Sequence, residues 1–283
     1  MELFGTIPEP VGRLSIFVAV FVVMALLEVG LPKRALTVAR PRRWLTNLGI
    51  AGAGSLLVRI MAWLPQVLGT VIIPLAAVAT AVWAEDKGIG LFNWLHWPAW
   101  IEIVLTVVIL DFALWLQHLL SHRVPMFWRL HQVHHADVDF DLTTGIRFHP
   151  VEIGLSMLFK MAWVLVLGPA VIAVVLFEVI LNSTAMFNHA NVALPSLLDR
   201  VLRAVVVTPD MHRVHHSIIR DEHSNNFGFN LSVWDRLFGT YVDQPRDGHL
   251  GMTIGLAHYQ SESPTRFTWS LLLPFRARPR VDK

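Results

Sequence analysis

The chain contains no cysteine. This absence excludes disulfides, iron–sulfur clusters held by thiolates, and zinc sites with cysteine ligands. Any metal ion must therefore be held by nitrogen or oxygen atoms. Charged residues are also scarce, at 16% of the 283 residues, whereas 54% are hydrophobic and the mean hydropathy is +0.52. This composition predicts an integral membrane protein with several spans.

The few basic residues are clustered. The net charge is only +2 although the pI is about 9.3, and we interpret the clusters as topology signals and predict no nucleic-acid binding. The first apolar segment, residues 14–31, lacks a basic leader and a small-residue cleavage site, so we expect a retained anchor. Five basic residues and no acidic one follow in residues 33–43. The positive-inside rule places that loop in the cytoplasm and the N-terminus outside.

The later apolar segments predict the rest of a helical bundle. Pro65 and Pro74 interrupt residues 45–83, which form either one span with a kinked, interfacial or re-entrant continuation, or two spans. Tryptophans crowd residues 83–100, as is typical of an outer interface, and favour the first alternative, with an inward span over 98–119. Gly168-Pro169 divides residues 151–186 into a hairpin. We predict an all-α polytopic membrane bundle of about four spans plus a kinked or re-entrant segment, with a cytosolic helical cap.

Histidines recur at helical spacing in four places. Two stand at i and i+4 at the end of the inward span, two H-x-x-H-H boxes follow about eighty residues apart, and one lies in a Phe-Asn-His-Ala-Asn element. Residues three or four apart share one face of a helix, and Pro125, Thr208 and Pro209 are typical of the helix starts that precede the boxes. Nine imidazoles suffice for two metal ions with about four ligands each. The predicted metal ligands are His118, His122, His131, His134, His135, His189, His212, His215 and His216.

Two further residues are catalytic candidates. Asp111 lies two turns before His118 on the same face, and a carboxylate in an apolar helix is costly without a partner, so we predict a role near the metals. Asp210 and Asp235 are further candidates for orienting ring N–H groups. His149, in Arg-Phe-His-Pro, either binds metal or handles protons, or forms a structural turn. The remaining histidines are expected to be structural: His96, His223, His249 and His258.

The order of these motifs resembles the fatty acid hydroxylase/sterol desaturase superfamily of integral-membrane, non-haem di-iron oxidoreductases. The resemblance rests on H-x-x-x-H, W-x-x-H-x-x-H-H, Phe-x-His-Ala-Asn and H-x-x-H-H, extends to residues 143–150, 226–230 and 234–241, and covers roughly residues 100–245. It implies a mushroom-like bundle with a cytosolic cap over a dimetal site. The family's histidine ligands carry over onto the nine positions above. Ala185 stands where some relatives have a second histidine, one turn before His189.

The chemistry expected of such a site is oxidative. Breaking an unactivated C–H bond needs a redox metal and dioxygen, and the boxes contain none of the glutamates that soluble di-iron bundles use. The resemblance implies two iron ions, O2 as co-substrate, and hydroxylation or desaturation of a lipid (fatty acyl, sterol-like or isoprenoid) in lipid biosynthesis. The alternative is a membrane metal-binding or transport protein without oxygenase activity. Transport would need polar residues along a path through the bilayer, but the polar residues in the spans are scattered and the histidines collect on one side. This distribution favours the enzyme.

The expected organisation follows from these assignments. Residues 1–97 form an N-terminal membrane anchor region, 98–245 the hydroxylase-like catalytic domain, and 246–283 a cytosolic tail. No haem-binding module is fused to the chain, so we expect a separate electron-transfer protein as a partner, besides the membrane and the lipid substrate. The expected location is a bacterial inner membrane with the active site facing the cytoplasm.

Overall fold

Five long helices form the body of the protein. The computed structural model describes residues 2–3, 7–67, 76–95 and 97–277. Within them, five helices are long and apolar enough to cross a membrane. They are α1 (Glu9–Gly30), α2 (Arg40–Val67), α5 (Ala99–Arg123), α7 (Pro150–Leu167) and α8 (Val171–Asn188). The predicted all-α membrane bundle is confirmed, and the two halves of the predicted hairpin are full helices that bring the candidate spans to five.

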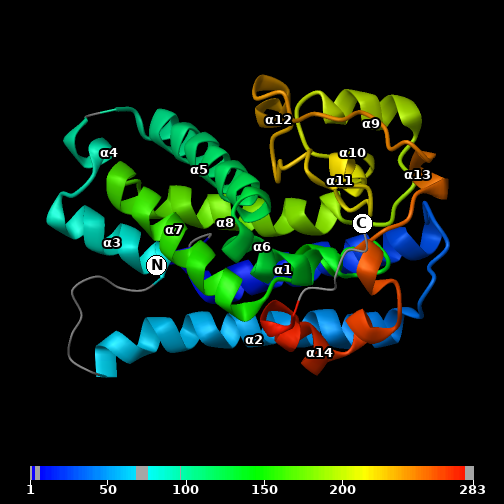
Figure 1. The fold of residues 1–283 in the computed structure, drawn as a ribbon. Helices are drawn as coiled ribbons and strands as arrows, with labels where there is room; N and C mark the ends of the chain where they lie inside the picture. The colour runs from blue at the N-terminus through cyan, green and yellow to red at the C-terminus, as the bar shows by residue number, and fades with distance from the viewer. Residues whose placement is uncertain (1, 4–6, 68–75, 96, 278–283) are drawn as a thin grey trace.

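One end of the bundle is closed by short elements. α3 (Ala77–Lys87) packs against α7 and α8, and α4 (Leu91–Trp94) follows it (Figure 1). α3 has 11 residues, whereas a span needs about 20, so the described part of the chain between α2 and α5 holds no second full span. Residues 68–75, with Pro74, and His96 lie outside the described residues. A Cβ on Gly90 would lie 2.2 Å from the backbone nitrogen of Gly168, so only glycine permits this contact with the hairpin turn.

The other end carries a cap of short helices and loops (Figure 1). α6 and α10 both begin with proline, and the Thr208 hydroxyl accepts a hydrogen bond from the Met211 N–H at 3.3 Å, which confirms the predicted helix starts. The short elements are β1 (Glu2–Leu3), β2 (Ile7–Pro8), α6 (Pro125–His135), η1 (Thr144–Ile146), α9 (Ser196–Arg203), α10 (Pro209–His215), α11 (Arg220–His223), α12 (Val233–Leu237), α13 (Gly248–Gly251), η2 (Ala257–Tyr259), η3 (Ser263–Thr265), α14 (Phe267–Leu272) and η4 (Leu273–Phe275).

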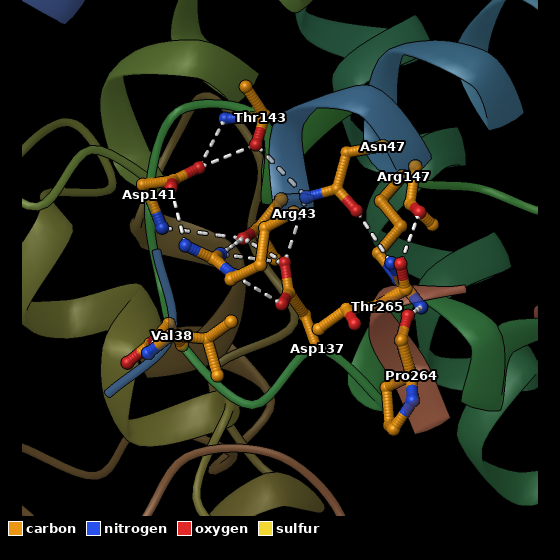
Figure 2. Close-up of polar contacts among 12 residues, drawn as sticks. Val38, Arg43, Asn47, Asp137, Asp141, Thr143, Arg147, Pro264 and Thr265 are labelled. Atoms are coloured by element: carbon orange, nitrogen blue, oxygen red, sulfur yellow. Dashed lines mark hydrogen bonds and ion pairs between the residues drawn. The ribbon is translucent and has the colours of Figure 1, made fainter. Parts of the chain in front are cut away.

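A buried polar network ties the start of α2 to the loop after α6 (Figure 2). The Arg43 guanidinium is fully buried and donates to Asp137 at 2.8 Å and to Asp141 at 2.6 Å. Asn47 donates to Asp137 at 2.9 Å and accepts from Arg147 at 2.6 Å. Buried charges persist only when they are paired and hydrogen-bonded. The network therefore fixes the loop that leaves the first H-x-x-H-H box.

The other basic residues of segment 33–43 also have acceptors within the protein. Lys33 pairs with Asp210 at 2.8 Å, Arg34 donates to the backbone oxygens of His249 and Met252, Arg40 donates to the Glu28 backbone oxygen, and Arg42 pairs with Glu262 at 2.7 Å. The segment predicted to mark membrane topology is thus also a clamp between α1, α2 and the cap. Its cytoplasmic orientation stays a prediction.

Candidate metal centre

The nine predicted histidines gather into two adjoining groups. Group one contains His118, His122, His131, His135 and His215, and group two contains His134, His189, His212 and His216. Each histidine of a group offers one ring nitrogen, and these nitrogens all lie within 4.8 Å of one another. Every member is buried except His122, which is partly exposed. All nine belong to one compact cluster, because the rings of His135 and His216, one from each group, stack with centroids 4.6 Å apart.

Each H-x-x-H-H box contributes two histidines to one group and one histidine to the other group. In α6, the i and i+4 pair His131 and His135 belongs to group one, while His134 belongs to group two. In and after α10 the pair His212 and His216 belongs to group two, while His215 belongs to group one. Members of an i, i+4 pair share a helix face, and the third histidine points to the neighbouring group. The end of α5 completes group one, and the end of α8 completes group two.

Four rings have an oxygen acceptor at Nδ1. His118 and His215 face the backbone oxygens of Phe227 at 2.7 Å and Asn225 at 2.6 Å. His189 faces the Ala185 backbone oxygen at 2.8 Å, and His131 faces the Glu152 carboxylate at 2.6 Å. Because these oxygens only accept, Nδ1 carries the proton in each neutral ring, and Nε2 keeps a free lone pair.

Two of these lone pairs face each other at a short distance, because Nε2 of His118 lies 3.0 Å from Nε2 of His131. Two bare lone pairs repel at such a distance unless a cation lies between them. In group two, Nε2 of His189 lies 3.2 Å from Nε2 of His134. Nitrogen ligands of one metal ion, at bonds of about 2.1 Å, lie roughly 3 Å apart or more. The arrangement therefore fits a metal ion in each group.

Unpartnered nitrogens support the same fit. Among the nine grouped histidines, buried ring nitrogens without a hydrogen-bond partner occur in His122, His134, His135, His212, His215 and His216, and outside the groups in His249. A buried polar atom without a partner is costly. Metal coordination would satisfy one nitrogen of each of these grouped rings.

Burial keeps six of the nine histidines neutral, as ligation requires. It lowers the pKa of His189 to about 3. Burial, and then neighbouring imidazoles, lower the pKa well below its ordinary value in His134, His135, His212, His215 and His216. At neutral pH these rings present lone pairs and carry no charge.

The Asp111 carboxylate binds a loop in this structure and not a histidine ring. It accepts from the backbone N–H groups of Asn230 at 3.3 Å and Leu231 at 3.2 Å, and from the indole of Trp234 at 2.8 Å. Asp235 accepts from the Phe227 N–H at 2.9 Å. The loop held by both carboxylates supplies the Phe227 oxygen that faces His118, so their link to the histidines runs through the backbone. The catalytic role predicted for Asp111 stays a prediction.

Sequence reasoning missed Glu152 as a partner of the site. It stands in the first turn of α7, is largely buried, and is the only described carboxylate within ion-pair distance of a grouped histidine. A signal was present, because a glutamate in an apolar span needs a partner. The partner itself is 21 residues away in the sequence and is set by how α6 packs against α7.

His149 lies outside both groups. Its Nδ1 accepts from the Val151 N–H at 3.2 Å at the start of α7, and its Nε2 lies 3.2 Å from the Leu271 backbone oxygen. These contacts are those of a helix N-cap, and the predicted catalytic role stays untested. Asp210 pairs with Lys33 and Arg213 rather than with a grouped ring.

The histidines expected to be structural have different surroundings. His223 stacks on Trp128 with ring centroids 5.7 Å apart and lies 6.2 Å from both His122 and His135, so it borders group one. His249 lies 3.8 Å from Asp210, and His258 is exposed.

Two cavities reach group one from different sides. The membrane cavity, of about 490 Å³, is lined by α1, α2, α5, α7 and α8, and it includes His118, His131 and Glu152. The cap cavity, of about 440 Å³, reaches the partly exposed His122 beside Trp128 and His223. A ligand in the membrane cavity would lie next to one histidine group.

Comparisons with known proteins agree with this geometry. A family model described as fatty acid hydroxylase matches residues 103–240, which hold all nine histidines. Relatives include the ornithine lipid hydroxylase OlsE of Rhizobium tropici, 27% identical over 182 residues (64% of this chain, 51% of the relative). Alkylglycerol monooxygenases of Xenopus tropicalis (30% identical; 56% of this chain, 33% of the relative) and Homo sapiens (29%; 58% and 35%) also match.

The chain spans about half or less of the length of these curated relatives. No solved structure matches it. The family match, the relatives and the histidine motifs all fall on the same part of the sequence. Over residues 103–240, the chain belongs to the fatty acid hydroxylase/sterol desaturase superfamily.

Proposed function

We propose that this protein is a membrane-bound, non-haem di-iron oxidoreductase that hydroxylates a lipid with O2 and electrons from a separate protein. The observation that carries the proposal is the position of the histidine groups. Nine clustered imidazoles meet a cavity walled by candidate membrane spans. A lipid can enter such a cavity from the bilayer without crossing water.

The overall reaction balances with an external reductant. One C–H bond, O2, two electrons and two protons give one C–OH group and one water molecule. Two iron ions bound by groups one and two would supply the redox chemistry that activates dioxygen. Desaturation starts from the same C–H cleavage, and the names of the relatives, all hydroxylases or monooxygenases, favour hydroxylation.

The residues of this chain hold the site ready for that reaction. The Nδ1 contacts of His118, His131 and His215 fix each ring with Nε2 toward its group. Leu114 and Phe229 give the cavity beside His118 an apolar wall. An apolar wall holds a hydrocarbon next to the metals and excludes water from them.

The orientation in the cell follows from the basic segment. We place segment 33–43, the cap and the metal centre in the cytoplasm of a bacterial cell, where an electron-transfer protein meets them. The partly exposed edge of His122 is the part of group one nearest to such a partner.

His134→Ala and His215→Ala test the function, since each removes a ligand from a different group. Purified wild-type protein is expected to hold two iron ions per chain, and each variant to hold less iron and lose activity. The measurements are metal analysis and mass spectrometry of lipids from expressing cells, where the product is heavier by one oxygen or, for desaturation, lighter by two hydrogens. His258→Ala, an exposed histidine outside both groups, is the control for metal binding and should keep the wild-type iron content.

Two results would contradict the proposal. Iron content that does not depend on either ligand would remove the dimetal site. An iron-loaded protein that gives no oxygen-dependent lipid product would leave metal binding or transport as the better assignment.

A further inference from the structure

The far end of the membrane cavity is charged. Besides the histidines, its lining includes the charged cluster, which consists of Arg13 on α1, Arg59 on α2, Lys160 on α7 and Glu178 on α8. All four belong to candidate membrane spans. Ionisable residues in spans are expensive and usually serve a function. The proposed hydroxylation uses none of them.

The charged cluster has an excess of positive charge. Glu178 pairs with both Arg13 and Lys160, and Arg13 also pairs with Glu9 at 2.9 Å. Three cations thus meet two carboxylates. Within the described residues, Arg59 has no acidic partner. A purely structural network between helices would not need this additional cation, whereas an anionic ligand would complete it.

The four charges line one cavity. α2 and α7 run side by side, with Gly54 against Ile153 and Met61 against Gly154. Arg59 lies between Gly54 and Met61 on α2, and it lines the same cavity as Lys160. Glu178 and Arg13 are joined to Lys160 by the ion pairs above. The cluster is therefore one site.

A fixed distance separates this site from the histidines. Glu152, which holds His131, and Lys160 are eight residues apart on α7, which is about 12 Å along the helix. An extended chain advances about 1.2 Å per bond. About ten bonds therefore fit between the charged cluster and group one. The wall between them is largely apolar. Of its polar residues, Gln117 and Ser156 are hydrogen-bonded to each other at 3.2 Å, and Asn182 donates to the Glu178 backbone oxygen at 2.7 Å.

The cavity is accessible from the side. α1 packs against α8 and α2 against α7, and both α1 and α2 line the cavity. Ser55 and Arg59 on α2 are exposed at this edge. An amphiphile within the bilayer can enter between α1 and α2 while its polar group stays in contact with the protein surface.

We propose that the substrate is a lipid with an anionic group, a carboxylate or a phosphate, which binds at Arg13, Arg59 and Lys160 while its chain extends to group one. The inference rests on the proposed function and adds the recognised group and the position of attack. Oxidation falls in the middle of a long chain, about ten bonds from the anion, and not beside it.

Arg59→Gln tests the proposal in the iron-loaded full chain in lipid nanodiscs. The substrates are palmitate, its methyl ester, phosphatidylglycerol and uncharged diacylglycerol. Wild type should favour an anionic lipid over its neutral counterpart by about tenfold or more in kcat/KM, since a charge-assisted contact contributes that much. Arg59→Gln should lose this preference through KM, with kcat unchanged. Mass spectrometry of the product should place the new hydroxyl about ten bonds from the anion.

The matched control is Arg42→Gln on the same helix, which removes an exposed arginine that pairs with Glu262 away from the cavity. It should keep the wild-type preference. A preference for palmitate over its ester assigns a carboxylate, and a preference for phosphatidylglycerol over diacylglycerol assigns a phosphate. A binding assay without turnover, displacement of a fluorescent fatty acid from the metal-free protein, should show weaker binding in Arg59→Gln only.

The experiments distinguish failure of the anion site from failure of the proposed hydroxylase activity. Product from neutral and anionic lipids alike, with equal KM in wild type and Arg59→Gln, overturns the anion site and leaves the hydroxylase intact. A hydroxyl beside the anionic group overturns it as well. If no lipid gives product, the hydroxylase fails, and equal displacement in wild type and Arg59→Gln then overturns the anion site separately.

Discussion

At the residue scale, one histidine is held differently from the others. Backbone oxygens face Nδ1 of His118, His189 and His215, whereas a carboxylate, Glu152, faces Nδ1 of His131. A carboxylate raises the basicity of the ring it holds as well as fixing its orientation. His131 is therefore expected to be the strongest donor to the ion of group one.

Glu152→Gln removes this charge with little change in size. We expect about tenfold weaker binding of one of the two metal ions, at the lower end of what loss of such a partner costs, while the other ion stays bound. Competition with a chelator, followed by metal analysis, measures both affinities. Thermal unfolding of the metal-free protein should be unchanged, which separates a positioning role from a structural one.

Glu102→Gln is the matched control, because Glu102 accepts from the Ala170 N–H at the opposite end of the bundle. Equal loss of both ions in Glu152→Gln, or none, would contradict the role of Glu152.

Sequence spacing predicts the nine histidines of the centre but not how they divide. The i, i+4 rule gives shared faces within one helix. It cannot show that His134 joins His212 and His216, because that depends on how α6 and α10 meet. For the same reason, the Glu152 contact and the loop-holding bonds of Asp111 are beyond local patterns. These contacts depend on how helices far apart in the sequence pack against one another.

At the element scale, the start of α2 has a structural task that its charge does not reveal. Arg43 and Asn47 hold Asp137, Asp141 and Arg147, which belong to the loop between the first box and α7 (Figure 2). The sequence predicts a topology signal here from the basic residues alone. Helix starts and the hairpin are predictable because proline and glycine act locally, whereas this network joins residues about ninety positions apart.

Arg43→Ala should lower the free energy of unfolding by about 3–5 kcal/mol, because it leaves buried carboxylates without their partner. Arg42→Ala, one residue away, breaks an exposed ion pair with Glu262. It should change the free energy of unfolding by no more than about 0.5 kcal/mol. Denaturant unfolding in detergent compares the two. Similar values for both variants would show that the network does not stabilise the fold.

At the scale of the whole molecule, the two ends of the bundle differ in chemistry. The cap carries both histidine groups, and the opposite end carries α3, α4 and exposed tryptophans such as Trp94 and Trp100 (Figure 1). The membrane cavity leads from the spans to group one, and the cap cavity reaches it from the cap. Substrate and reductant can therefore approach one metal group from different sides.

The orientation of these ends can be tested because the chain has no cysteine. Asp86→Cys places a thiol on α3, and Asp221→Cys places one on α11 in the cap; the native side chains are 68% and 81% exposed. Since the five basic residues of segment 33–43 lie at the cap end, we expect the cap to face the cytoplasm. An impermeant maleimide should label Asp86→Cys in intact cells, and Asp221→Cys only after permeabilisation. Labelling of Asp221→Cys in intact cells, with Asp86→Cys protected, would reverse the orientation and place the reductant outside the cell.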